Sequence, residues 1–88
     1  MYKLQFLRSA VKELSRLDLP HQKIIKRKLQ ILARDPRVLA NNITKLSGSH
    51  KAYYRLRVGS YRVVYEKRDD KLVIIVIRIG HRKDVYSF

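Results

Sequence analysis

The sequence predicts an α/β fold in which a two-helix hairpin packs on a small sheet, in the order strand, helix, helix, strand, strand, strand. Three observations lead to this expectation. Apolar and polar residues alternate at the start of the chain, two apolar stripes at helical spacing follow, and the second half alternates again between turn residues. We expect residues 1–88 to form a single domain, because this length suffices for one compact core.

The opening strand and the first helix are indicated by the spacing of their apolar residues. The segment Tyr2-Lys3-Leu4-Gln5-Phe6 alternates as a half-buried strand does. Ser9 then occupies the position of a helix N-cap. One helical face follows it, made of Ala10, Val11, Leu14 and Leu17. Asp18-Leu19-Pro20 interrupts this helix, and Pro20 suits the first turn of the next one.

The second helix, expected over residues 21–33, combines an apolar stripe with a basic surface. The stripe consists of Ile24, Ile25, Leu29 and Leu32, and the basic residues, interpreted as a solvated face, are Lys23, Lys26, Arg27 and Lys28. Asp35-Pro36 stops the helix, so the two helices are expected to form an antiparallel hairpin. Residues 35–49 contain Asn41-Asn42 and Ser47-Gly48-Ser49, and we expect a connecting loop there.

Three strands are expected in the second half of the chain. Residues 53–58 alternate, which places Tyr54, Leu56 and Val58 on one face and Tyr53, Arg55 and Arg57 on the other. Gly59-Ser60 is a two-residue hairpin signal, and residues 61–67 form the next strand. Residues 72–79 are apolar except for Arg78, so we expect them to form the central strand, covered on both faces.

Composition narrows the class of protein. The net charge is +14, with 21 Lys and Arg against seven acids, and this surplus favours a polyanionic partner, nucleic acid first. An acidic protein, an anionic membrane and a purely solubilising coat remain alternatives. The absence of cysteine excludes disulfides and thiolate chemistry. No apolar run approaches the ~20 residues that cross a bilayer, so we expect a soluble, cytoplasmic protein without a membrane partner.

The residue types in the second half suit RNA cleavage without a metal or cofactor. The 2′-hydroxyl of RNA can attack the adjacent phosphorus if the protein transfers protons and neutralises charge. Arginine neutralises phosphate, histidine transfers protons near neutral pH, and tyrosine stacks on bases. The chain offers Arg55, Arg57 and Arg62 on adjacent strands, then His81, Arg82 and Tyr86 after them. Glycine-rich phosphate loops, paired metal-spaced histidines and nucleophile elbows are missing from the sequence.

Several of these side chains have a purely structural alternative. Tyr54, Tyr61 and Tyr65 are expected in the core or at its margin, and His21 and His50 on the surface. For His81 a structural and a catalytic role are about equally supported, because Arg82 and Tyr86 lie in the same short tail.

Three segments in this order, KLSG (45–48), YRLRVGSYRVVYE (54–66) and GHRKDVY (80–86), resemble the RelE/ParE toxin superfamily. With the two-helix layout, the resemblance covers nearly the whole chain. It implies a RelE-like fold with a helix hairpin on a twisted, mainly antiparallel sheet. It also implies the toxin of a type II toxin–antitoxin system that cleaves mRNA in the ribosomal A site. The implied partners are the ribosome, mRNA and a cognate antitoxin with an acidic segment. The toxin–antitoxin complex would bind operator DNA through the antitoxin.

The resemblance also implies roles for individual residues. Arg62 matches the strand arginine that binds the phosphate at the cleavage point. Arg82 matches the tail arginine implicated in transition-state stabilisation or leaving-group protonation, and Tyr86 the tail tyrosine that stacks on a substrate base. The best-known member carries lysines, proposed to activate the nucleophile, on the strand where this chain has Tyr53, Arg55 and Arg57.

This departure leads to a hypothesis about the general base. Arginine, with a pKa above ~12, is a poor base. We therefore take His81 as the candidate base, with Arg55, Arg57 and Lys51 binding phosphate. Three other functions stay open: a ParE-like inhibitor of DNA gyrase without RNA chemistry, a plain nucleic-acid-binding module, and an inactive relative that sequesters antitoxin.

Overall fold

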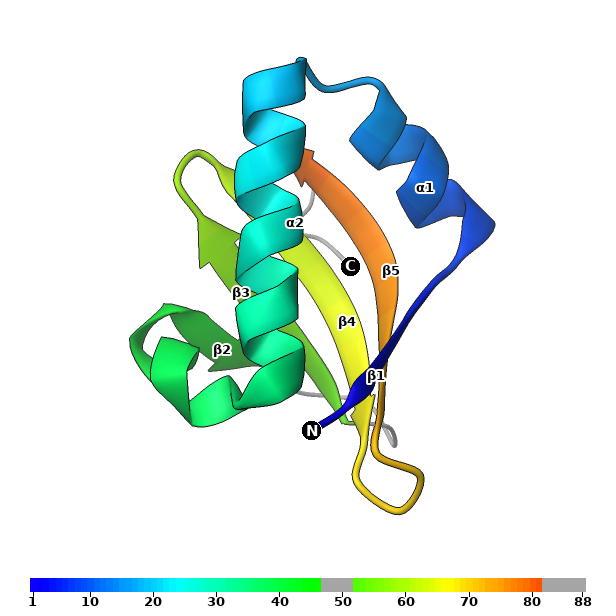
Figure 1. Ribbon diagram of the computed structural model, residues 1–88, viewed down its shortest axis with the longest axis vertical. Coiled ribbons are helices and arrows are strands. Elements are labelled where there is room, and N and C mark those ends of the chain that lie inside the picture. Colours follow the sequence, from blue (N-terminus) through cyan, green and yellow to red (C-terminus); the bar gives the residue numbers. More distant parts are fainter. Residues whose placement is uncertain (47–51, 82–88) are drawn as a thin grey trace.

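The computed structural model describes residues 1–46 and 52–81, which form helices packed on one five-stranded sheet (Figure 1). The strand order is β1-β5-β4-β3-β2; β1 runs parallel to β5 and the other neighbours are antiparallel. This confirms the expected mainly antiparallel sheet. The elements are β1 (Lys3–Phe6), α1 (Arg8–Ser15), α2 (Leu19–Arg34), a 3-10 helix η1 (Pro36–Asn42), β2 (Ile43–Lys45), β3 (Tyr53–Val58), β4 (Tyr61–Arg68) and β5 (Val73–His81).

Both α-helices lie on the same face of the sheet, as the helix pattern predicts (Figure 1). Pro20 occupies the first turn of α2, where a missing N–H costs no hydrogen bond. The apolar stripe of α2 enters the core through Ile25, Leu29 and Leu32, each at most 1% exposed. The sheet meets this stripe with Leu56, Val63, Tyr65, Ile74, Val76 and Ile79. Helix hairpin and sheet therefore share one hydrophobic core.

The expected loop at residues 35–49 is wrong over most of its length. Residues 36–42 form η1, where the Asp35 side chain accepts a hydrogen bond from the Arg37 N–H. Residues 43–45 form β2, an edge strand paired with β3 through Ile43 and Leu56. Three residues are too few to show alternation, which explains why the sequence did not reveal this strand. Residues 47–49 lie outside the described residues.

Two further expectations are corrected. Ser9 is not an N-cap: α1 begins at Arg8, and the Ser9 hydroxyl donates to the Ile77 carbonyl at 3.2 Å. The central strand is β4, not the apolar segment 72–79, and four consecutive β4 residues, 63–66, are buried. β5 lies between β1 and β4, with Ile75 and Ile77 only half-buried. Its apolar run reflects β-branched residues on a partly solvated face rather than burial on both sides.

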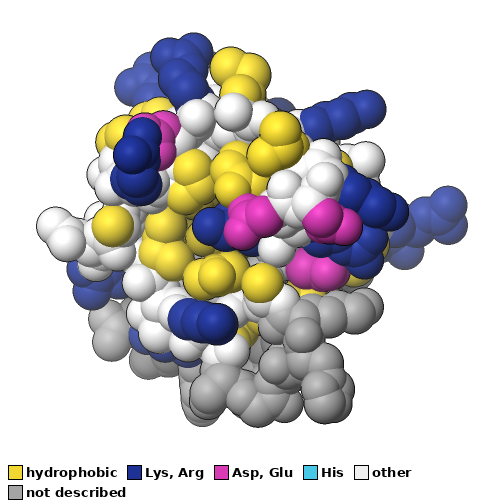
Figure 2. All heavy atoms as spheres, turned by 90° about the horizontal axis from the view of Figure 1, so that it is seen from below, with side chains coloured by type: hydrophobic (Ala, Val, Ile, Leu, Met, Phe, Trp, Pro, Cys, Tyr) yellow, Lys and Arg dark blue, Asp and Glu magenta, His cyan; other side chains and the backbone are white. Residues whose placement is uncertain are grey.

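The end of the molecule that carries the N-terminus and the β4–β5 turn is partly apolar. Figure 2 shows hydrophobic side chains gathered at its centre, with most Lys and Arg towards the rim and acidic side chains beside the apolar centre. Met1, Tyr2 and Leu4 line a pocket here together with Ala33 of α2.

Within residues 1–46 and 52–81, no helix is long and apolar enough to cross a membrane.

Candidate nucleic-acid interface

Three arginines share the face of the sheet that points away from the helices. Arg57 of β3 pairs in register with Arg62 of β4, and directly opposed residues of an antiparallel pair point to the same side. Arg55 lies two residues before Arg57 and so shares that side. The neighbouring residues Leu56 and Val58 are buried on the helix side. The alternation predicted for residues 53–58 is therefore confirmed.

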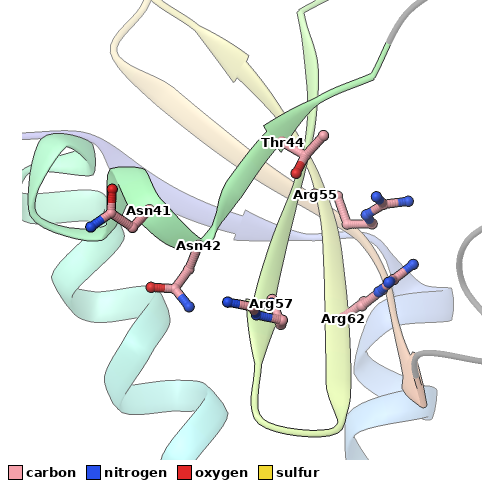
Figure 3. Close-up of a pocket in the computed structure, with 6 residues that line it drawn as sticks. All are labelled: Asn41, Asn42, Thr44, Arg55, Arg57 and Arg62. Carbon is pink, nitrogen blue, oxygen red and sulfur yellow. The ribbon is translucent and has the colours of Figure 1, made fainter.

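These arginines surround a pocket of about 210 Å³. The side chains that line it come from η1, β2, β3 and β4: Asn41, Asn42, Thr44, Arg55, Arg57 and Arg62 (Figure 3). Thr44 belongs to this group because β2 pairs with β3 in a register that sets Thr44 opposite Arg55. The sequence reasoning missed Asn41, Asn42 and Thr44. It had placed them in a loop, and only the pairing of β2 brings them beside the arginines.

Two arginines of this pocket, Arg55 and Arg57, have no carboxylate partner within the described part of the chain. Five acids of the described chain form ion pairs elsewhere: Glu13 with Arg78, Asp18 with His21, Asp35 with Arg37, Glu66 with Arg68 and Asp69 with Lys67. In the described part of the chain, no ion pair involves Arg55 or Arg57. Like charges held close together repel one another, so the positive charge of Arg55 and Arg57 favours an anion in this pocket.

His81 lies on the other side of the sheet from the three arginines. It pairs in register with Tyr61, and the two rings meet edge to face with centroids 5.9 Å apart. The His21 ring lies 4.9 Å from Tyr61 on the same side. A second pocket, of about 310 Å³, is lined here by Glu13, Arg16, Leu17, Tyr61, Arg78, Ile79, Gly80 and His81. The described structure therefore does not bring His81 together with Arg55, Arg57 and Arg62.

Helix α1 anchors the end of β5 that carries His81. β1 pairs with β5 only as far as Val76, so among the described residues the later part of β5 has no strand neighbour on that side. Side chains of α1 replace it: Ser9 donates to the Ile77 carbonyl, and the Ile79 N–H donates to Glu13 Oε1 at 2.8 Å. Glu13 Oε2 also accepts a hydrogen bond from Arg78 at 3.2 Å. One carboxylate thus accepts hydrogen bonds from two consecutive residues of β5, Arg78 and Ile79, just before the segment 80–86.

Tyr54, Tyr61 and Tyr65 lie in the core or at its margin, as expected for residues with a structural role. Tyr65 is 1% exposed, and burial raises the pKa of its phenol. Tyr54 stacks on Tyr65 with ring centroids 5.5 Å apart, and Tyr61 packs against the core from its margin. The His21 side chain is 45% exposed and hydrogen-bonded to Asp18, as expected for a surface residue.

The remaining site residues of the sequence prediction lie outside the described residues. These are Lys51, Arg82 and Tyr86, together with His50. Their roles stay predictions. What the described chain presents is a pocket lined by three arginines on the face of the sheet away from the helices, and one of them, Arg62, pairs in register with Gly80 near the end of β5.

The chain is similar to known proteins over nearly its full length. A family model described as the ParE toxin of type II toxin–antitoxin system, parDE, matches residues 4–86. The mRNA interferase toxin RelE of Escherichia coli (strain K12) is 35% identical over 88 residues, covering 98% of this chain and 90% of that protein.

Two solved structures share the fold. RelE in the archaeal RelE–RelB complex from Pyrococcus horikoshii OT3 has a TM-score of 0.81 at 27% identity, covering 94% of this chain and 97% of that one. The isolated Escherichia coli RelE toxin has a TM-score of 0.72 at 36% identity, covering 99% and 93%. The fold and the resemblance expected from the sequence are both confirmed. The chain belongs to the RelE/ParE family of toxins of type II toxin–antitoxin systems.

Proposed function

We propose that this protein is an endoribonuclease that cleaves mRNA in the ribosomal A site, by attack of the RNA 2′-hydroxyl on the neighbouring phosphorus and without a metal ion. The observation that carries the proposal is the pocket lined by Arg55, Arg57 and Arg62, in which the charge of Arg55 and Arg57 is not offset by any ion pair of the described chain. The relatives named mRNA interferases support the same reaction.

The pocket suits the charge development of this reaction. As the 2′-oxygen attacks, the phosphorane gains negative charge, and guanidinium groups that line the same pocket can stabilise it. Arg62 sits directly across from Arg57 on the neighbouring strand, so two planar donors face the same anion. Arg62 is assigned to the phosphate at the cleavage point, and Arg55, Arg57 and Lys51 to phosphate binding. Arg82 stabilises the transition state or protonates the leaving group, and Tyr86 stacks on the substrate base.

The candidate proton acceptor is the imidazole of His81. This histidine belongs to the segment 80–86, yet its ring faces Tyr61 rather than the arginine pocket. Proton transfer by His81 therefore requires its ring to reach the other face of the sheet when RNA is bound. The effect of His81→Ala on the cleavage rate separates this role from packing against Tyr61.

The proposed inhibitor is a cognate antitoxin. RelE toxins have been solved in complex with RelB antitoxins from Pyrococcus horikoshii and Escherichia coli. A chain with a net charge of +14 and an open arginine pocket would bind an acidic antitoxin segment, and occupation of the pocket would exclude RNA. Operator DNA would be bound through the antitoxin of this complex.

The test is induced expression in a bacterial host, followed by mapping of new 5′ ends on translated and untranslated transcripts. We expect codon-phased cuts in translated mRNA, absent from untranslated transcripts and from the variant carrying Arg82→Ala and Tyr86→Ala. Cuts in untranslated RNA would contradict ribosome dependence.

A second function is favoured by the family match itself, because the matching model is that of the ParE toxin. In this alternative the chain inhibits DNA gyrase and has no RNA chemistry. Growth arrest with intact mRNA, together with inhibition of gyrase in a DNA supercoiling assay, would establish it in place of cleavage.

A further inference from the structure

We infer that Asn41 and Asn42 read the base of the nucleotide next to the phosphate that the arginines bind, and so set the sequence preference of cleavage. This inference rests on the proposed RNA cleavage. It concerns the wall of the pocket opposite Arg62, formed where η1 ends and β2 begins.

The position of the two amides follows from the strand pairing. η1 ends at Asn42, and β2 starts at the next residue and pairs with β3, so Thr44 lies opposite Arg55. This register holds the end of η1 against the arginine-bearing strand. In Figure 3 the Asn42 amide and the Arg57 guanidinium point toward one another, and both residues line the same pocket.

The chemistry of this wall differs from that of the rest of the pocket. Arginine only donates hydrogen bonds, which suits phosphate oxygens that only accept. A base edge carries donors and acceptors side by side, and a carboxamide matches it because it has both an N–H₂ and a C=O group. Asn41 and Asn42 bring these groups to the pocket, so the wall they form suits a base, while the arginines suit the phosphate beside it.

A purely local role does not account for the two amides. Asparagine at the end of a helix usually hydrogen-bonds to nearby backbone. Among the hydrogen bonds within residues 1–46 and 52–81, none comes from the side chain of Asn41 or Asn42. Asn42 is nonetheless half-buried, and both residues line the pocket.

The size of the pocket favours one unit of a polymer over a free small molecule. Its volume of about 210 Å³ is below the roughly 300–1,000 Å³ typical of sites that enclose a drug-sized ligand. A single-stranded RNA can place one phosphate and one splayed base in such a pocket while the rest of the chain stays outside.

The experiment uses purified protein in a reconstituted translation reaction, on mRNAs whose codon in the A site is randomised. Sequencing the cut ends gives the cleavage rate and the base frequencies beside the cut. A bidentate contact between an amide and a base is worth roughly 5- to 150-fold in discrimination. We expect the wild type to prefer certain bases at one position beside the cut, and Asn41→Ala and Asn42→Ala to flatten this preference.

The control is Gln30→Ala, which removes an exposed carboxamide from α2, on the helix side of the sheet, and is expected to keep the wild-type preference. Arg57→Ala should instead slow cleavage at all codons in proportion. If Asn42→Ala does not fold, Asn41→Ala still tests the inference, because Asn41 is exposed and its replacement should not disturb the fold.

An unchanged preference in both asparagine variants, or a wild type that cuts all codons alike, would overturn the inference while leaving the proposed cleavage intact. A wild type that does not cut mRNA at all would overturn the proposed function itself. The two failures are therefore distinguishable in one experiment.

Discussion

The two faces of the sheet are held in place by different forces. On the helix side, Val63, Tyr65, Ile74 and Val76 are at most 1% exposed and pack against α2. On the opposite side, Arg57 and Thr44 are exposed, and Arg55 and Arg62 are half-buried. Burial of one large apolar side chain stabilises a fold by about 1.5–3 kcal/mol, whereas exposed charges contribute about 0–1 kcal/mol even when paired.

This difference shows which face is available for function. Substitutions on the helix side act through stability, because every buried side chain there contacts others. On the arginine side, Val64 pairs in register with Arg55 and is buried, but the arginines themselves are exposed or half-buried, and their like charges oppose folding. We therefore expect substitutions of the arginines to change activity while leaving the fold intact.

His81 is the sharpest test of this division, because it lies on the helix side but was expected to do chemistry. If it transfers the proton, His81→Ala lowers the cleavage rate by about 10²–10⁴-fold, measured on translated mRNA. A loss of less than about tenfold would assign His81 to packing against Tyr61, consistent with the edge-to-face contact of the two rings. Arg82 is kept in both cases, so that the comparison isolates the imidazole.

The core of the helix side predicts a large loss of stability. Leu29 has no exposed surface, so Leu29→Ala removes buried apolar groups and leaves a cavity. We expect a loss of about 2–5 kcal/mol in the free energy of unfolding, measured by urea denaturation. Ile24→Ala provides the control, because this residue on the same helix is 50% exposed and should cost much less. Equal losses for the two variants would contradict the assigned face of α2.

Glu13 connects the two regions through the end of β5. Glu13→Ala leaves the Ile79 N–H, in a residue that is 1% exposed, without its acceptor. An unsatisfied buried donor costs about 1–3 kcal/mol. Glu13→Gln keeps an oxygen at the same position and should retain more of the stability. Identical unfolding curves for the two variants would show that the carboxylate is not needed to complete the strand edge.

The smallest expected effect is a pH dependence on the helical side of the molecule. The hydrogen bond with His21 lowers the pKa of Asp18, and that with Arg37 lowers the pKa of Asp35. A carboxyl group whose pKa is lowered by folding stabilises the fold above its ordinary value of 3.8, and this contribution is lost as the pH falls through the lowered pKa. Stability should therefore fall as the pH decreases below about 4.

The measurement for this effect is the urea midpoint at about pH 6 and about pH 3. Asp18→Asn and Asp35→Asn should reduce the difference between the two values. Both carboxylates are solvent-accessible, so the change should be small beside that of Leu29→Ala. A midpoint that rises toward the lower pH would contradict the direction worked out here.

The sequence predicted the parts of the fold that rest on a long periodic pattern. The apolar stripe of α2 and the alternation of β3 have enough residues to define a face. The alternation of β3 correctly predicted that Arg55 and Arg57 share one side of the sheet. β2 has three residues and is defined only by its pairing with β3. For this reason Asn42 and Thr44 were missed as pocket residues. The order of strands was also hidden, because an apolar run such as β5 does not show which neighbours it has.

The central claim, that the arginine face is the cleavage site, is tested most directly by the rate at which Arg62→Ala cuts mRNA in a reconstituted translation reaction. The matched control is Arg27→Ala, which removes one positive charge from the exposed surface of α2. We expect Arg62→Ala to lose about 10²–10³-fold in cleavage rate, as for other groups that stabilise a transition-state charge. Arg27→Ala should cut nearly as fast as the wild type. Undiminished cleavage by Arg62→Ala, or an equal loss in Arg27→Ala, would contradict the claim.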